Sequence, residues 1–479
     1  MNKFNTIIIY VALLLCGKVY SQEFLDTALL RREVTFISTD DKGGRYPDSR
    51  GSKLVAEYVL SSFKQAGLKL LCSGGYQQFS LVDGWKPDSE NTASFCGKPL
   101  KAYADFAPID YFHTLQASLS AEIVFVGCGN DINWAKCKGK WVMILCLKER
   151  NYSTIASRAI KHGVGGIILA RTDHALPKYQ YANVLRIKTK TTTTLGPVVE
   201  VSLGVAEEIL KHSNKDLNIK ELVEVEKKNN NSVIPLGVTF EARTSFKPKE
   251  LTCRNVVAIL EGSDPKLKNE YIVVGAHYDH LGIQKSSTSS DTTKVIYNGA
   301  DDNASGVVGL VELAKYFGSL NVKPKRSIVF VAFDAEEEGL LGSENFLTQD
   351  IGINTSQIKA MVNLDMIGRY SALQTLSIVG CNTSKEGEKL VKELVKNSPI
   401  TAKIASNASL ITMTSDHLNF YRKNIPVFLL NTGRHVDYHK STDTAEKIDT
   451  YGMSQIIMIA KELVDNLANR KTNLTFKSL

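Results

Sequence analysis

Five short apolar runs in the second half of the chain constrain its fold more than any other feature. They are rich in β-branched and aromatic residues, as buried strands are. They read YIVVGAH (271–277), SIVFVAF (327–333), KAMVNLD (359–365), TLSIVG (375–380) and PVFLLN (426–431). Helical patterns at 305–317, 384–396 and 451–468 lie between or after them. Strands that alternate with helices build a sheet with helices on its faces. The sequence therefore predicts an α/β fold with a mostly parallel or mixed sheet.

The rest of the chain has a different texture. A chain of 479 residues is long enough for two or more domains. The segment AEYVLSSFKQAGL (56–68) has apolar residues at a helical period and ends at a glycine. Short apolar runs recur between polar turns from 121 to 211, namely AEIVFVG, KWVMILC, VGGIILA and GPVVEVS. This middle block is typical of a small β-rich domain with a helix or two.

The N-terminus predicts export. Lys3 precedes an apolar stretch from Ile7 to Cys16, and small or polar residues follow, so residues 1–21 read as a signal peptide cleaved near Ser21. We expect a secreted or periplasmic protein with no transmembrane segment in its mature chain, because the apolar stretch is too short to span a bilayer. A lipid anchor on Cys16 is the alternative, which the bulky Leu15 before it disfavours.

Charge gives little support for nucleic acid as a partner. The formal net charge is +8, and removal of Lys3 and Lys18 with the signal peptide lowers it to +6. The basic residues form no block along the sequence. None of the eight cysteines forms a CxxC zinc or redox motif.

Acidic residues and histidines follow the predicted strands. Ligands bind at the carboxyl ends of strands in open α/β sheets, and several carboxylates gathered there need a counter-charge, most simply a metal ion. The candidates stand in VVGAHYDHLG, NGADDNASG, FDAEEEG, VNLDMIG and DYHKSTDT, and are His277, Asp279, Asp301, Asp302, Glu336, Glu337, Asp365 and His439. Each motif alone has an ordinary explanation, such as a helix cap or a solvated helix start. Five motifs at the strand ends of one sheet favour a metal site.

The types of residue favour zinc over a hard cation. Zinc accepts imidazole nitrogen and carboxylate oxygen, and two zinc ions roughly 3.5–4 Å apart need a bridging carboxylate. A structural calcium site is a further possibility that the two histidines, His277 and His439, disfavour.

These motifs resemble those of the secreted co-catalytic di-zinc aminopeptidases, which are related to glutamate carboxypeptidase, glutaminyl cyclase and the transferrin receptor. The resemblance covers about 240–467 and places the five motifs in the family's order. It implies two Zn²⁺ per chain. One ion would be held by His277, Asp302 and Asp365, and the other by Asp302, Glu337 and His439.

The resemblance also implies roles for neighbouring residues. Glu336 would be the general base, Asp279 would orient the His277 imidazole, and Tyr438 would help to stabilise an oxyanion. Asp301 would support Asp302. Glu338, which falls where relatives often have an apolar residue, is expected to be a solvated bystander or a charge at the substrate rim.

The same resemblance suggests a domain plan. After the signal peptide, 22–120 would be the N-terminal part of the catalytic domain, 121–211 an inserted protease-associated-like domain, and 235–470 the di-zinc peptidase domain. The segment GGRYPDSRGSKLVAEYVLSSFKQAGL would pack onto the peptidase domain.

The activity implied is that of a metallo-aminopeptidase acting on peptides through a metal-bridging water. A dipeptidase or carboxypeptidase could use the same two metals. A glutaminyl cyclase keeps a similar frame with one zinc, and the complete two-metal ligand set argues against it. A non-enzymatic, receptor-like scaffold is also possible, although loss of ligands would mark it and none is lost. The oligomeric state and the preferred first residue stay open.

Overall fold

The computed structural model describes residues 25–109, 116–129, 132–146, 152–171, 196–213, 218–219, 233–285, 294–405 and 414–479. The chain forms two compact units. The first contains the described residues up to Leu81 together with Leu251–Leu479, and the second is Val82–Glu250. The predicted signal peptide and Cys16 lie outside the described residues.

A mixed sheet forms the centre of the first unit, in the strand order β17-β16-β18-β15-β11-β14-β10. The four strands β14, β11, β15 and β18 run parallel, whereas β10 and β16 run antiparallel to their neighbours β14 and β18. The strands are β10 (Ile234–Leu260), β11 (Tyr271–His277), β14 (Ser327–Phe333), β15 (Ile358–Leu364), β16 (Leu376–Val379), β17 (Ala402–Ile404) and β18 (Val427–Asn431). The predicted α/β fold with a mostly parallel or mixed sheet is confirmed.

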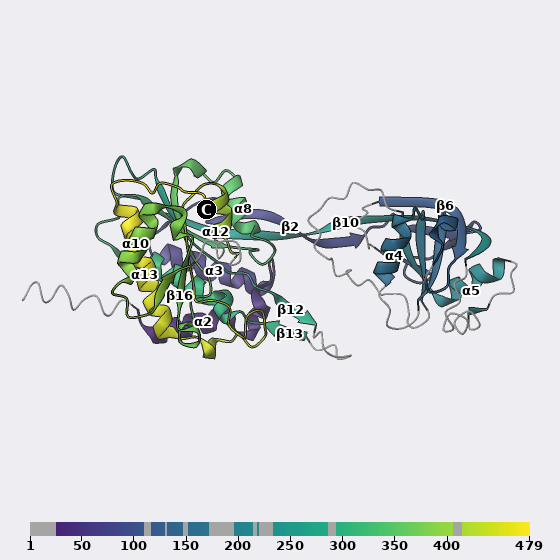
Figure 1. Ribbon diagram of the computed structural model, residues 1–479, viewed down its shortest axis with the longest axis horizontal. Coiled ribbons are helices and arrows are strands. Elements are labelled where there is room, and N and C mark those ends of the chain that lie inside the picture. Colours follow the sequence, from purple (N-terminus) through teal and green to yellow (C-terminus); the bar gives the residue numbers. More distant parts are fainter. Residues whose placement is uncertain are drawn as a thin grey trace, which may run out of the picture. The chain divides into compact units, whose positions relative to one another are not determined.

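Helices cover both faces of this sheet (Figure 1). One face packs against α2 (Thr27–Ser38), α3 (Arg50–Gln65), α7 (Gly306–Ser319), α10 (Lys385–Val395) and α13 (Thr450–Asn469). The other face packs against α8 (Leu341–Thr348) and α12 (His417–Arg422). The strands are buried on both faces, as strands in a parallel sheet between helices are. Successive residues of β11, such as Val273 and Val274, therefore belong to the hydrophobic clusters on opposite faces of the sheet.

Short elements complete the first unit. They are η1 (Asp40–Arg45), β1 (Lys69–Leu70), the hairpin of β12 (Gly282–Lys285) and β13 (Lys294–Tyr297), the π-type turn η3 (Ala300–Ser305), η4 (Thr355–Gln357), α9 (Tyr370–Leu373), η5 (Cys381–Thr383) and η6 (Ala445–Lys447). Strand β2 (Tyr76–Pro87) begins in the first unit and continues into the second. No helix in the described part of the chain is both long enough and apolar enough to cross a membrane.

The second unit has its own sheet, in which β6, β7, β8 and β9 run parallel to one another. Its strands are β3 (Thr92–Phe95), β4 (Lys98–Leu100), β5 (Phe106–Pro108), β6 (Gln116–Phe125), β7 (Trp141–Cys146), β8 (Gly166–Arg171) and β9 (Val198–Val201). Two helices, α4 (Tyr152–Lys161) and α5 (Leu203–His212), and the short η2 (Trp134–Cys137) accompany them. The unit begins before residue 121 and ends after residue 211, the boundaries expected for the insertion.

The parallel strands determine where the polar residues meet. His277 is the last residue of β11, and Phe333 of β14 pairs with it. The neighbouring strand β15 ends at Leu364, directly before Asp365. Because these strands are parallel neighbours, the loops that follow them leave the same edge of the sheet.

Candidate metal centre

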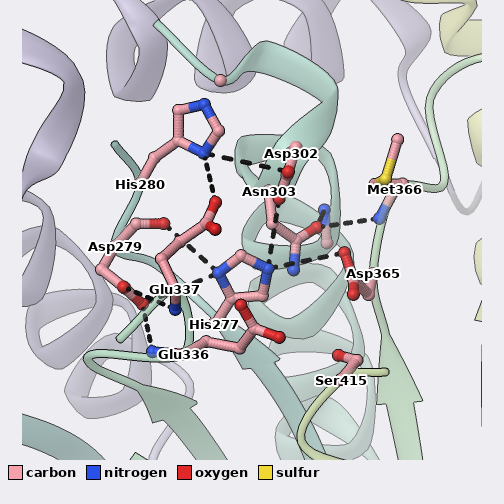
Figure 2. Close-up of polar contacts among 12 residues, drawn as sticks. His277, Asp279, His280, Asp302, Asn303, Glu336, Glu337, Asp365, Met366 and Ser415 are labelled. Carbon is pink, nitrogen blue, oxygen red and sulfur yellow. Dashed lines mark hydrogen bonds and ion pairs between the residues drawn. The ribbon is translucent and has the colours of Figure 1, made fainter. Parts of the chain in front are cut away.

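His277 lies at the centre of a group of carboxylates (Figure 2). Its Nε2 atom is 3.3 Å from Oδ1 of Asp302 and 3.5 Å from Oδ1 of Asp365. On the other side of the ring, Nδ1 is 3.3 Å from the backbone oxygen of Asp279 and 3.7 Å from its Oδ1. All four side chains are at least nine-tenths buried. Nε2 of His277 thus faces the carboxylates of Asp302 and Asp365, which come from two other loops.

Asp302 faces a second group with its other oxygen. Oδ2 of Asp302 is 3.1 Å from Nε2 of His439 and 3.9 Å from Nδ1 of His280. Glu337 completes this group, because its Oε2 is 3.3 Å from Nε2 of His439 and its Oε1 is 2.8 Å from Nδ1 of His280. The two oxygens of one carboxylate therefore face different histidines, His277 on one side and His439 on the other.

Glu336 and Glu337 are oriented by the turn after β14. Their backbone N–H groups donate to the two carboxylate oxygens of Asp279, at 3.0 and 3.2 Å. The backbone oxygen of Glu336 accepts from the N–H groups of Gly339 and Leu340. Asp279 therefore contacts the backbone of both glutamates as well as the His277 ring.

The loop that holds Asp302 is fixed from two directions. Oδ2 of Asp443 accepts from the backbone N–H groups of Asp301 and Asp302, at 2.9 and 3.1 Å. Asn303 donates to the backbone oxygen of Leu364 and accepts from the N–H of Met366, which joins the loop to the end of β15. These bonds tie Asp302 to the strand that precedes Asp365.

Asp301 points away from the metal ligands proposed from the sequence. Its Oδ1 accepts from the N–H of Gly368 at 2.6 Å and from Ser305 Oγ at 3.1 Å, and its Oδ2 lies 3.2 Å from Nε2 of His435. It is fully buried. In this position Asp301 holds neighbouring loops together.

The electrostatics of the groups reflect burial among like and unlike charges. Burial alone would lower the pKa of His277, but Glu336 and then Asp279 and Asp302 raise it well above its usual value. Burial alone would raise the pKa of Asp302, but contacts with His277, His280 and His439 hold it well below. Burial raises the pKa of Glu336 well above its usual value, and Glu337 acts in the same direction.

His439 and Tyr438 have shifted pKa values too. Burial would lower the pKa of His439, but Asp302 and Glu337 raise it to about 10. Burial raises the pKa of Tyr438, so its hydroxyl keeps its proton at neutral pH. The Tyr438 ring stacks on His439, with centroids 3.9 Å apart. His277 and His439 therefore both hold protons that a divalent cation would displace.

A cleft opens onto this arrangement. Twelve residues line it, namely His277, Asp302, Glu336, Glu337, Asp365, Met366, Thr414, Leu429, Asn431, Arg434, Tyr438 and His439. The five proposed metal ligands, the proposed base Glu336 and Tyr438 all line the cleft. Asp279 and Asp301 do not line it, and Asp279 contacts His277. The structure thus brings the predicted residues together.

The donor set fits zinc. Imidazole nitrogens and carboxylate oxygens are ligands that zinc accepts. Two groups of three side chains have donor atoms within 4.8 Å of one another, namely His277, Glu336 and Asp365, and His280, Asp302 and Glu337. Oδ1 of Asp365 is buried and has no hydrogen-bond partner among the residues that the structure describes. A buried carboxylate oxygen of this kind is suited to a cation.

Two features differ from the sequence analysis. The expectation that Glu338 is solvated is wrong, since only 6% of it is exposed. The turn after β14 folds back through bonds from Gly339 and Leu340 to Glu336, which places Glu338 inside. His280, which the sequence analysis did not single out, is fully buried against Glu337. Its place in the motif HYDH, three residues after His277, is the sequence feature that could have identified it as part of the site.

Comparisons with known proteins show that this region is similar to a peptidase family. Residues 255–464 match the model of Peptidase family M28. A probable zinc metalloprotease of Pyrenophora teres f. teres (strain 0-1) is 41% identical over 117 residues, which are 24% of this chain and 23% of that protein. Leucine aminopeptidase 2 of Arthroderma otae (strain ATCC MYA-4605 / CBS 113480) is 27% identical over 234 residues, 47% of this chain and 42% of that one. The chain thus spans about a quarter of the first relative and less than half of the second.

A solved structure extends the likeness in fold beyond the matched region. The aminopeptidase from Aneurinibacillus sp. strain AM-1 aligns with a TM-score of 0.51 at 20% identity, over 95% of this chain and 96% of that one. At this identity the alignment shows a shared fold. The family match, in contrast, runs from β10 to α13 and includes every ligand proposed from the sequence. Residues 255–464 are therefore similar to Peptidase family M28.

Proposed function

We propose that this protein is a zinc-dependent aminopeptidase that removes N-terminal residues from peptides. The position of Asp302 supports this proposal most directly. Its two carboxylate oxygens lie 3.3 Å from His277 and 3.1 Å from His439, on opposite sides. A carboxylate placed between two histidines suits a ligand that bridges two metal ions.

We assign two zinc ions per chain to this centre. His277, Asp302 and Asp365 would hold one ion, and Asp302, Glu337 and His439 the other. When bound, the ions would lower the pKa of a water molecule and polarise the scissile carbonyl. His280 donates to Glu337 and would fix the orientation of that carboxylate.

The protein's own residues account for the proton transfers. Glu336 lines the cleft beside His277 and Asp365 and would accept a proton from the attacking water. It would then pass this proton to the leaving amine. The Tyr438 hydroxyl, which is protonated at neutral pH, would donate a hydrogen bond to the developing oxyanion.

The charge of the cleft favours the amino end of a peptide. Four carboxylates line it, namely Asp302, Glu336, Glu337 and Asp365. A free amino group is attracted to such a surface, whereas a free carboxylate is repelled unless the metal ions or another cation offset the charge. We therefore favour cleavage after the first residue.

One observation favours a second candidate, a carboxypeptidase or dipeptidase. Arg434 lines the same cleft, is exposed, and lies over the Tyr438 ring at 5.1 Å. A guanidinium in this place could bind the terminal carboxylate of a short peptide. The first point to test is therefore whether the protein cleaves peptides from the amino end or from the carboxyl end.

The test is a panel of tripeptides of one sequence with either end blocked, together with dipeptides that are free at both ends. We expect the purified protein to cleave a tripeptide amide with a free amino group and to leave the acetylated tripeptide intact. Chelation should abolish turnover, and two equivalents of zinc per chain should restore it. Cleavage of only the acetylated acid would establish a carboxypeptidase, and cleavage of only doubly free dipeptides a dipeptidase. A chain that binds zinc but cleaves nothing would support the receptor-like alternative.

We also propose that the chain is exported, as the N-terminal signal predicts, and that residues 121–211 belong to a protease-associated-like domain. The second unit, Val82–Glu250, contains this segment.

A further inference from the structure

Arg45 is a buried cation from a distant part of the chain that contacts the loops of the metal centre. It is the last residue of η1 and is fully buried. Its Nε donates to the backbone oxygen of Tyr278 at 2.8 Å, across 233 positions of sequence. Its Nη1 and Nη2 donate to the backbone oxygens of Asn298 and Gly299, at 2.5 and 2.9 Å. A further bond of 3.3 Å from Nη1 reaches the oxygen of Ile37.

These acceptors belong to the two loops that hold proposed ligands. Tyr278 lies directly after His277, and Gly299 lies three residues before Asp302. The backbone N–H of His280 donates in return to the oxygen of Arg45, at 3.3 Å. The first loop is therefore bonded to Arg45 on both sides of Asp279.

The two loops are also in close contact with each other. Gly299 has a φ of +56°, and a Cβ atom there would lie 2.1 Å from the backbone oxygen of Asp302 and 2.5 Å from the His280 ring. The His280 ring of the first loop therefore packs directly against the backbone of the second loop at Gly299. A guanidinium that bonds both loops therefore fixes the separation of His277 and Asp302.

The charge of Arg45 adds to this effect. Burial lowers the pKa of Arg45 to about 10, while the carboxylates of Asp302 and Asp279 oppose the shift, so the side chain stays protonated at neutral pH. The guanidinium donates to the backbone oxygens of Ile37, Tyr278, Asn298 and Gly299, which are uncharged, so these bonds do not neutralise its positive charge. It thereby offsets part of the repulsion among these acids.

We propose that Arg45 is a positioning residue of the metal centre, which holds the His277 loop and the Asp302 loop at the separation that zinc binding needs. The inference rests on the proposed function, because it takes His277 and Asp302 as ligands. It makes the N-terminal segment a working part of the centre, although the family match begins only at residue 255.

The chain offers a matched control in Arg326. This arginine is also buried, with 1% exposed, and donates to the backbone oxygens of Leu467 and Arg470 at 3.4 and 2.6 Å. These acceptors lie at the end of α13 and contain no proposed ligand. Loss of either guanidinium leaves buried carbonyls unpaired, so both losses should weaken folding. Only the loss of Arg45 should change the metal centre.

The experiment compares R45Q and R45K with R326Q and R326K in the full chain. The zinc dissociation constant is measured by competition with a chelator, at a temperature where circular dichroism shows each variant folded. We expect R45Q to weaken zinc binding about tenfold or more, the usual scale for residues that orient ligands. R326Q should stay within about twofold of the wild-type protein. R45K should recover part of the loss, because it keeps the charge and some of the bonds.

The outcomes separate this inference from the proposed function. Wild-type affinity in R45Q, or an equal loss in R326Q, would overturn the positioning role while leaving the proposed function intact. If R45Q does not fold, R45K decides, and wild-type zinc affinity together with wild-type kcat in R45K would count against the inference. A wild-type chain without zinc binding would overturn the proposed function and this inference together.

Discussion

Glu336, Glu337 and Glu338 are adjacent in the sequence but have three different environments. Glu336 faces the cleft beside His277 and Asp365, and Glu337 contacts His280 and His439. Glu338 is buried inside the turn. A turn after a buried strand can separate neighbouring side chains in this way, because successive residues point in different directions. The chemical role of each glutamate follows from its direction.

The first prediction at this scale concerns Glu336. Changing Glu336 to Gln keeps the shape and removes the base, so kcat should fall by roughly a hundredfold or more while the zinc content stays unchanged. Changing Glu337 to Gln should lower zinc occupancy along with activity. Glu344→Gln, at an exposed position in the first turn of α8, is the matched control and should leave both unchanged. Steady-state kinetics and metal analysis measure these effects.

The contrary result would have a specific meaning. His277, Glu336 and Asp365 have donor atoms within 4.8 Å of one another. If Glu336→Gln lost zinc as readily as Glu337→Gln, Glu336 would be a ligand and the general base would have to be sought elsewhere.

Local sequence predicted the residues in the cleft but not those that support them. His277, Asp302 and Asp365 each follow or adjoin a strand or a glycine turn, which is a signal within a few positions. Arg45 acts across 233 positions and Asp443 across 141, and no local pattern relates them to the loops that they contact. The prediction that Glu338 is solvated was wrong for a related reason, since the burial of this side chain depends on how the turn folds back.

At the scale of elements, the predicted strands agree with the observed ones because each is a continuous apolar run. The runs at 271–277 and 327–333 match β11 and β14 residue for residue. The helix expected at 56–68 instead begins at Arg50, because Ser49 caps it by accepting from the N–H of Ser52. Its first turn, which includes Gly51 and Ser52, has no apolar periodicity. The N-cap at Ser49, rather than the apolar pattern, therefore determines where this helix begins.

The loop before α7 depends on one side chain, which gives a prediction at this scale. Asn303 is fully buried and donates to the oxygen of Leu364, while its own oxygen accepts from the N–H groups of Gly306 and Met366. Asn303→Ala would leave these three backbone groups without that partner. We expect the free energy of unfolding to fall by about 3 kcal/mol or more, as for several unsatisfied buried groups. Urea unfolding of the zinc-free protein measures it.

An exposed asparagine provides the control for this change. Asn354 caps η4 through a capping box, and its loss should cost about 1 kcal/mol. A cost for Asn303→Ala no larger than that for Asn354→Ala would show that the loop finds other partners.

At the scale of the molecule, the chain leaves the first unit at Leu81 and re-enters it at Leu251. The recurring short apolar runs predicted a β-rich domain at 121–211, whereas the second unit extends from Val82 to Glu250. The difference has a physical reason. The core of the second unit includes Phe95, Phe106 and Phe240, which lie outside the block. Short strands such as β3 and β5 have too few residues to show a period in sequence.

This division leads to a prediction about which part of the chain can be removed. Strands β2 and β10 pair with each other, and Leu81 and Leu251 pack against the same small cluster with Cys253. Replacing Val82–Glu250 by an Asn-Gly turn should therefore close β2 and β10 into a hairpin. We expect a folded protein that binds zinc and still cleaves dipeptides, with an altered preference among longer peptides if the second unit filters substrates.

The matched comparison is deletion of 121–211 alone. That deletion cuts through β6 and α5 and removes β7, β8 and β9, so Phe95, Phe106 and Phe240 lose most of the residues that cover them. Exposed aromatic surface of this kind favours aggregation. We expect this variant to be insoluble or to bind a hydrophobic dye, while the larger deletion stays monodisperse in size-exclusion chromatography. If the larger deletion unfolded and the smaller one kept zinc and activity, the boundaries at Leu81 and Leu251 would be wrong, and the segment 121–211 would be the separable piece.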